Sequence, residues 1–182
     1  FSPPESISSE RIFFRGMETL EGELERQQQW LREHEGTAVR DLLAMRAEGN
    51  LGYTQESKQK IVKRTEKKSQ LVEIYPGIVA VVMKQGMYDW WKDLGLIGRT
   101  TDGETVNLEA MVFMILPESV VIKRERGTTL PHEVNHVIWD LLGRSGFVRK
   151  PNMEDEIENN KFSRFRGELL AYLVGGRDGV IK

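Results

Sequence analysis

The sequence contains no cysteine, and only three of its 182 residues are histidine. The missing cysteine excludes disulfide bonds, a structural zinc held by thiolates and a cysteine nucleophile. Any bound metal must therefore be held by histidine, aspartate or glutamate. Long apolar runs are also missing. None approaches the about 20 residues that a membrane-spanning helix needs, so we predict no membrane span.

A large excess of charge of either sign is absent as well. The formal net charge of −2 gives no global attraction to nucleic acid or to anionic lipid. Hydrophobic residues make up 39% of the chain and charged residues 30%, as in ordinary globular proteins. Neither an internal repeat nor a low-complexity linker interrupts the chain. We therefore predict one domain over residues 1–182.

The first part of this domain, residues 8–68, is predicted to be helical. Two helices are expected between Ser8 and Glu48, with a break at Gly36-Thr37, because glycine can end a helix and threonine can cap the next. A third helix, Thr54 to Lys68, ends in a basic run. No aromatic residue is interleaved in this run for base stacking. We interpret the run as a solvated helix face and predict no nucleic-acid partner.

Residues 71–182 are predicted to combine strands and helices, which makes the fold class α+β. The strand-like segments are Leu71–Tyr75, Ile78–Met83, Met111–Leu116 and Ser119–Lys123. A short helix is expected around Trp90-Trp91, whose indoles we interpret as packing anchors, and a loop around Thr101-Asp102-Gly103 follows it. Two further helices are predicted over Leu130–Leu142 and Lys161–Val174.

The first of these two helices contains the sequence His132-Glu133-Val134-Asn135-His136. Residues four apart lie one turn apart on the same face of a helix, so both imidazoles can reach one metal ion. Glu133 projects to the neighbouring side, where a general base can act on a metal-bound water. Pro131 suits the first turn of such a helix. The alternative is a pair of surface histidines on an amphipathic helix.

A catalytic zinc needs three protein ligands and one open position. His34 lies in a charged helical segment, so we predict that the third ligand is a carboxylate. Glu168 is favoured because it sits in an apolar helix, where a carboxylate needs a compensating cation. Its alternative role is an ion pair with Arg164. A second source of carboxylates, interpreted as a hydrated loop, comprises Glu154, Asp155, Glu156 and Glu158.

With His132, Glu133, His136 and Glu168, residues 111–175 resemble the zincin metallopeptidases, and within them the compact minigluzincin type of gluzincin. The resemblance implies Zn²⁺ as cofactor, a peptide or protein as substrate, and Glu133 as the general base of peptide hydrolysis. It also implies a small, antiparallel-edged sheet over the active-site helix. Ser119–Lys123 would then be the substrate-binding edge. Tyr172 departs from the family pattern, in which an aspartate often follows the glutamate ligand by four residues.

Two other functions are compatible with the sequence. An inactive zincin-like domain would use its cleft for binding only. A helical interaction module built on residues 8–68 would leave the histidines incidental. The same charged helices are also candidates for a pro-segment that covers the cleft.

Overall fold

The computed structural model describes residues 9–99, 102–122 and 129–144 of the chain, which form an α+β fold. Its helices are α1 (Ser9–Glu33), α2 (Ala38–Glu48), α3 (Gln55–Glu66), α4 (Gln85–Asp93), α5 (Glu118–Ile122) and α6 (Thr129–Arg144). Its strands are β1 (Ser69–Tyr75), β2 (Ile78–Met83), β3 (Glu104–Asn107) and β4 (Val112–Pro117). Within these ranges, every helix is too short or too polar to cross a bilayer.

The four strands form one mixed sheet in the order β1-β2-β4-β3. β1 pairs antiparallel with β2, β2 pairs parallel with β4, and β4 pairs antiparallel with β3. β2 and β4 are therefore the central strands. β3 is the edge strand on the side of β4, and it is antiparallel to its neighbour.

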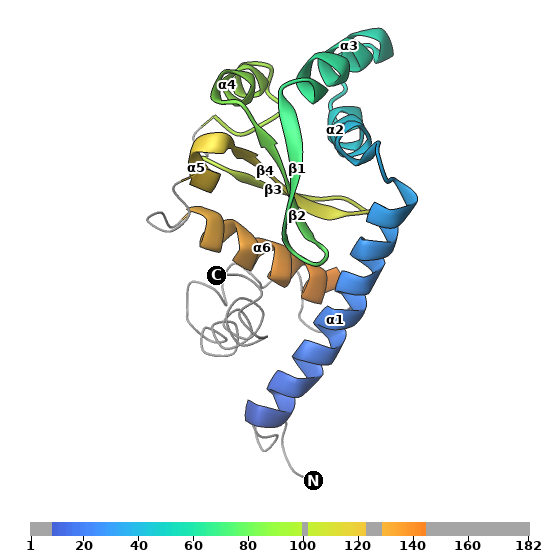
Figure 1. Ribbon diagram of the computed structural model, residues 1–182, viewed down its shortest axis with the longest axis vertical. Coiled ribbons are helices and arrows are strands. Elements are labelled where there is room, and N and C mark those ends of the chain that lie inside the picture. Colours follow the sequence, from blue (N-terminus) through green and yellow to red (C-terminus); the bar gives the residue numbers. More distant parts are fainter. Residues whose placement is uncertain (1–8, 100–101, 123–128, 145–182) are drawn as a thin grey trace.

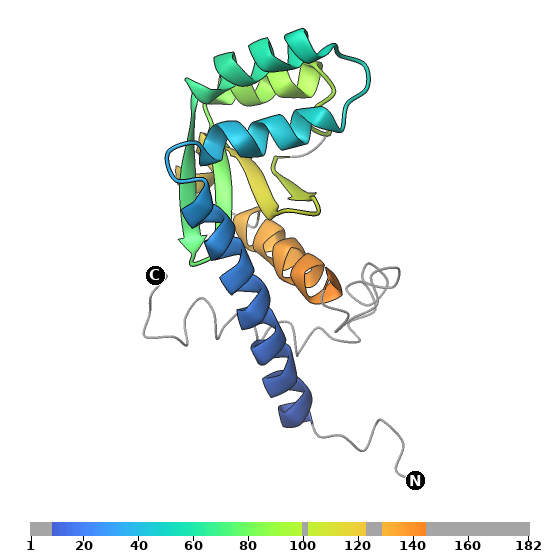
Figure 2. The ribbon, with the colours of Figure 1, turned by 90° about the vertical axis from the view of Figure 1, so that its right-hand side faces the viewer.

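Helices cover both faces of this sheet, which explains why every residue of β2 and β4 is buried (Figures 1 and 2). Successive side chains of a strand point to opposite faces. Ala80 and Met114 accordingly join a core with α1 and α6. Val81 and Phe113 join the core on the other face, with α2, α3 and α4. The molecule thus has three layers, with the sheet in the middle.

Most predicted elements of the described part are present. Gly36 has a φ of 84° at the break between α1 and α2, as a glycine that ends a helix often does. Thr37 lies at the start of α2, but its hydroxyl donates to Asp41 Oδ2 at 2.7 Å and caps no backbone N–H. Trp91 is fully buried, as expected of a packing anchor. The predicted helix over Lys161–Val174 lies outside the described residues.

Two predictions in the sheet were wrong. Ser119–Ile122 is part of helix α5 and not a strand, although Val120, Val121 and Ile122 are β-branched. Val120 and Val121 pack against the core around α6, so tertiary contacts override the local strand preference. The edge strand is β3, in a stretch that was predicted to belong to a loop. Val106 is the one apolar residue of β3 and the one that is buried, so the sequence shows no alternation of apolar and polar residues there.

Candidate functional site

Helix α6 presents the histidine motif because its opposite face is firmly packed. This apolar face consists of buried residues, as the sequence predicted: Val134, Val137, Ile138, Leu141 and Leu142. Leu20 and Leu24 of α1 belong to the same core, and α1 passes the C-terminal end of α6 (Figure 1). Pro131 lies in the first turn, where its missing N–H is not needed. The face that carries His132 is thereby held away from the sheet.

His132 and His136 point toward one another on this helix. Their Nε2 atoms are 2.9 Å apart, and their rings meet edge to face. His132 is exposed and His136 is half-buried. Two nitrogen ligands of a tetrahedral zinc lie about 3.3 Å apart, given Zn–N distances of about 2.0–2.1 Å. The observed Nε2–Nε2 distance of 2.9 Å is therefore about 0.4 Å shorter than the distance between two nitrogen ligands of one zinc.

Glu133 follows His132 in helix α6 and is hydrogen-bonded to edge strand β3. Its side chain is buried, with only 8% of the residue exposed. The hydroxyl of Thr105 on β3 donates a hydrogen bond to Glu133 Oε2 at 2.6 Å. Such bonds to an ionised acceptor are short and stronger than neutral ones. Thr105 therefore fixes one oxygen of the carboxylate and leaves Oε1 as the oxygen for a proton-transfer role.

A second carboxylate, Glu104, precedes Thr105 on the same strand. Burial raises the pKa of Glu104, and the charge of Glu133 raises it further, whereas Arg46 and a backbone hydrogen bond from Gly98 lower it. Arg46 Nε is 3.9 Å from Glu104 Oε2. This oxygen is buried and has no hydrogen-bond partner in the part of the chain that the structure describes. The edge strand thus brings a partly buried acid next to the histidine helix.

The third histidine, His34, was not predicted as a ligand, and it lies away from the histidine pair, directly after α1. His34 stacks on Trp30 at the end of α1, and its Nδ1 is 2.7 Å from the Trp30 carbonyl oxygen. Glu168 and the acidic segment 154–158 lie outside the described residues. Within 9–99, 102–122 and 129–144, no three His, Asp or Glu side chains are placed to hold a metal ion together. Among the described residues, His132 and His136 have ring nitrogens that lie close together.

Thr105 and Glu104 were not predicted as site residues. Both belong to strand β3, which was not predicted from the sequence. The only sequence signal for this strand is the pair Thr105-Val106, two β-branched residues between polar neighbours. Comparison with protein-family models, with curated proteins and with solved structures found no match to the chain.

Proposed function

We propose that the protein is a zinc-dependent metallopeptidase in which His132 and His136 bind the metal. The observation that carries the proposal is the 2.9 Å approach of their Nε2 atoms. Glu133, the residue between them that the motif assigns as general base, is buried. Two neutral imidazoles one helical turn apart are suitable zinc ligands. Glu168 is the proposed third ligand, on the sequence argument that a carboxylate in an apolar helix needs a cation.

In this proposal, Glu133 is the general base and Thr105 holds it. Zinc, when bound, lowers the pKa of a coordinated water and polarises the carbonyl of the substrate. Glu133 accepts the proton at Oε1 and returns it to the leaving amine. Its other oxygen, Oε2, stays hydrogen-bonded to Thr105. The carboxylate is thereby kept in one orientation through both proton transfers.

The position of β3 supports a peptide as substrate. An edge strand has backbone N–H and C=O groups on the side that faces away from its neighbour. Extended peptides bind such edges by adding a strand. β3 is antiparallel to β4 and touches α6 through the bond between Thr105 and Glu133. A peptide paired with β3 would therefore lie next to the histidine pair.

A domain that binds zinc and peptide without cleaving is the second candidate. One observation favours it, namely that Glu133 is buried and already hydrogen-bonded to Thr105. A carboxylate in this position can serve to anchor α6 on β3. Hydrolysis, and not zinc binding, separates this candidate from the metallopeptidase.

Metal content together with cleavage of casein tests the proposal. We expect about one zinc per chain, lost in His132→Ala and His136→Ala and retained in Glu133→Gln. Glu133→Gln should cleave casein about 10²- to 10⁴-fold more slowly than the wild type. A chain that binds no zinc in titration of a metal-free sample would refute the proposal. Stoichiometric zinc without cleavage would favour the binding domain.

The third ligand is tested with a matched pair of variants. Glu168→Ala should lower zinc affinity sharply. Joint replacement of Glu154, Asp155, Glu156 and Glu158 by their amides should change it only modestly, because hydrated charges act over a distance through screened electrostatics. The opposite result, with zinc lost from the amide variant and kept by Glu168→Ala, would move the third ligand to residues 154–158.

A further inference from the structure

A groove between α2 and α3 lies on the face of the sheet opposite to α6. Its volume is about 490 Å³, which is in the range of ligand-binding clefts. Ala44 and Val62 contribute aliphatic side chains to its lining, and no aromatic residue takes part. Residues of α2 and α3 pack into the core on the far side of the sheet from the histidine pair. The groove is thus separate from the proposed zinc site.

The lining of this groove is basic, although the whole chain has a formal net charge of −2. It contains four basic residues and two acidic ones. Both acidic residues already have a basic partner, Glu66 with Arg40 at 3.3 Å and Glu48 with Lys58 at 3.9 Å. Lys63 and Lys67 are exposed, and the structure records no ion pair for either within the described ranges. Two uncompensated cations therefore remain on the rim.

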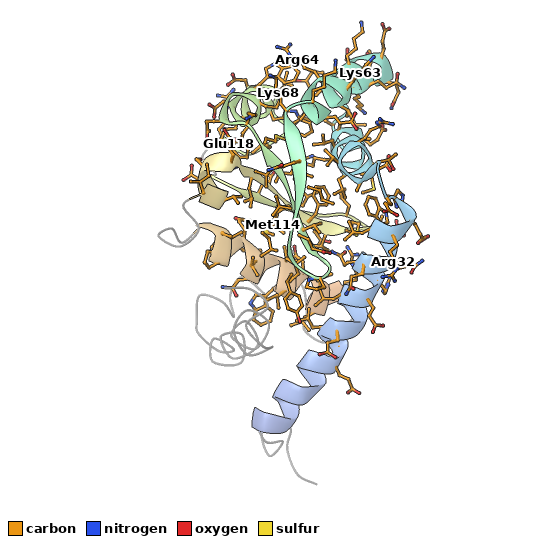
Figure 3. The ribbon with its side chains drawn as sticks, viewed as in Figure 1. Arg32, Lys63, Arg64, Lys68, Met114 and Glu118 are labelled. Carbon is orange, nitrogen blue, oxygen red and sulfur yellow. The ribbon has the colours of Figure 1, made fainter. Side chains whose placement is uncertain are left out.

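The spacing of these two lysines suits an extended peptide. Residues four apart on a helix are about 6 Å apart along its axis. Alternate residues of an extended chain, which point to the same side, are about 6.6 Å apart. Arg64 and Lys68 continue the positive surface beyond the groove, at the end of the molecule formed by α3 (Figure 3). Arg64 itself lies over the Trp90 ring, 4.7 Å from the ring centroid.

We propose that the groove between α2 and α3 binds an acidic peptide segment in extended conformation. Carboxylates on one edge of the peptide would pair with Lys63 and Lys67, and apolar side chains on the other edge would cover Ala44 and Val62. A peptide is favoured over single-stranded nucleic acid because the lining has aliphatic carbon but no aromatic ring on which a base could stack. This binding does not depend on the proposed hydrolysis.

Fluorescence anisotropy with a labelled peptide in which Glu alternates with Ala and Leu tests the proposal. We expect saturable binding that weakens as salt is added, because the contacts are exposed ion pairs. Lys63→Glu with Lys67→Glu should weaken binding at least about tenfold, since it replaces two attractions by two repulsions. The matched control is Arg32→Glu with Arg99→Glu. It changes the net charge equally at exposed positions that do not line the groove.

Three outcomes would overturn the proposal. The first is absence of saturable binding, which would leave the lysines as a solvated helix face. The second is an equal loss of affinity in the control variant, which would indicate attraction to net charge alone. The third is tighter binding of a single-stranded oligonucleotide of the same formal charge than of the peptide. Thermal unfolding of both variants, checked in parallel, separates a lost contact from a lost fold.

Discussion

Thr105 and Glu133 connect two elements that are distant in sequence through one short hydrogen bond. The donor belongs to edge strand β3, and the acceptor belongs to the histidine helix α6. A buried carboxylate that loses such a donor keeps its desolvation cost without compensation. The same hydroxyl lies 3.3 Å from the backbone oxygen of Glu133. At the residue scale, the orientation of the proposed general base therefore depends on a threonine.

Thr105→Val should test this dependence, since valine has nearly the same shape but cannot donate. We expect a loss of about 1.5–3 kcal/mol in the free energy of unfolding, the usual size for a hydrogen bond to a charged group. Casein cleavage should fall while zinc stoichiometry is unchanged. Urea denaturation and metal analysis measure these effects. Thr105→Ser retains the hydroxyl and should restore most of the loss. A valine variant as stable as the wild type would contradict the role assigned to Thr105.

Glu104 should make the stability of the protein dependent on pH. Because burial raises its pKa, the folded chain binds this proton more tightly than the unfolded chain does. The resulting stability is present below the unfolded-state pKa and is lost as the pH rises through the folded-state pKa.

Glu104→Gln removes this titration, so the variant should have a higher Tm than the wild type near pH 7. The difference should shrink as the pH is lowered from 7 to 4, because the wild-type carboxyl takes up its proton and becomes neutral like the amide. Scanning fluorimetry across this pH range is the measurement, and the exposed Glu109→Gln is the control. A variant that is less stable than the wild type near pH 7 would show that the contact with Arg46 outweighs the burial of Glu104.

At the scale of elements, Gln27 connects helix α1 to the sheet by hydrogen bonds. The side chain is 2% exposed. Its Nε2 donates to the carbonyl oxygens of Val112 at 2.6 Å and Gly77 at 3.1 Å, and its Oε1 accepts from Val112 N–H at 3.0 Å. Gly77 has a φ of 91°, and a Cβ there would come within 2.7 Å of the Leu24 carbonyl oxygen. The turn and the helix therefore touch at a position that only glycine fits.

Gln27→Leu should destabilise the protein strongly, because it leaves a buried N–H and a buried C=O of Val112 without their partner. Each unsatisfied group costs about 1–3 kcal/mol, so we expect the two groups to cost about 2–6 kcal/mol in the free energy of unfolding. Gln29→Leu changes an exposed residue of the same helix and should have a small effect. Equal denaturation curves for the two variants would indicate that α1 is detachable, as a pro-segment would be.

The elements that could be predicted from sequence are those in which neighbouring residues alone show the spacing of apolar side chains that a helix or a strand requires. β2 has its predicted bounds because a continuous apolar run begins after the Pro76-Gly77 turn. α6 was predicted because its apolar residues follow helical spacing. α5 was missed because packing of Val120 and Val121 overrides their strand preference. β3 was missed because its four mostly polar residues do not show a strand pattern, although β3 and β4 form a hairpin through the short connection 108–111.

The candidate site divides in the same way. The motif His132-Glu133-His136 is local, since one helical turn brings its residues together. The partners of Glu133 come from β3, so they depend on the register that places Thr105 opposite Met114 in the sheet. That register is set by the short connection between the two strands, in which the N–H of Leu108 donates to the carbonyl oxygen of Met111 at 2.9 Å. Thr105 could therefore be found only once the sheet was known.

At the scale of the whole molecule, one sheet separates two surfaces with different chemistry. The histidine pair lies on α6, on one side, and the basic groove lies between α2 and α3, on the other. The alternation of β4 side chains assigns Phe113 to the core under the groove and Met114 to the core under α6. Met114 lies in the middle of the sheet (Figure 3). Substitutions at these neighbouring positions should therefore perturb opposite surfaces.

Phe113→Ala and Met114→Ala should each lower the free energy of unfolding, by about 3–5 and 2–5 kcal/mol respectively, because both side chains are fully buried. Their effects on function should differ. A cavity at Met114 lies against α6 and should weaken zinc binding, whereas a cavity at Phe113 should weaken binding of the acidic peptide and leave zinc affinity nearly unchanged. Zinc titration and anisotropy on both variants, below their unfolding temperatures, provide the comparison. If either variant weakens zinc binding and peptide binding equally, a packing change on one face of the sheet also affects the other face, and the two surfaces are not independent.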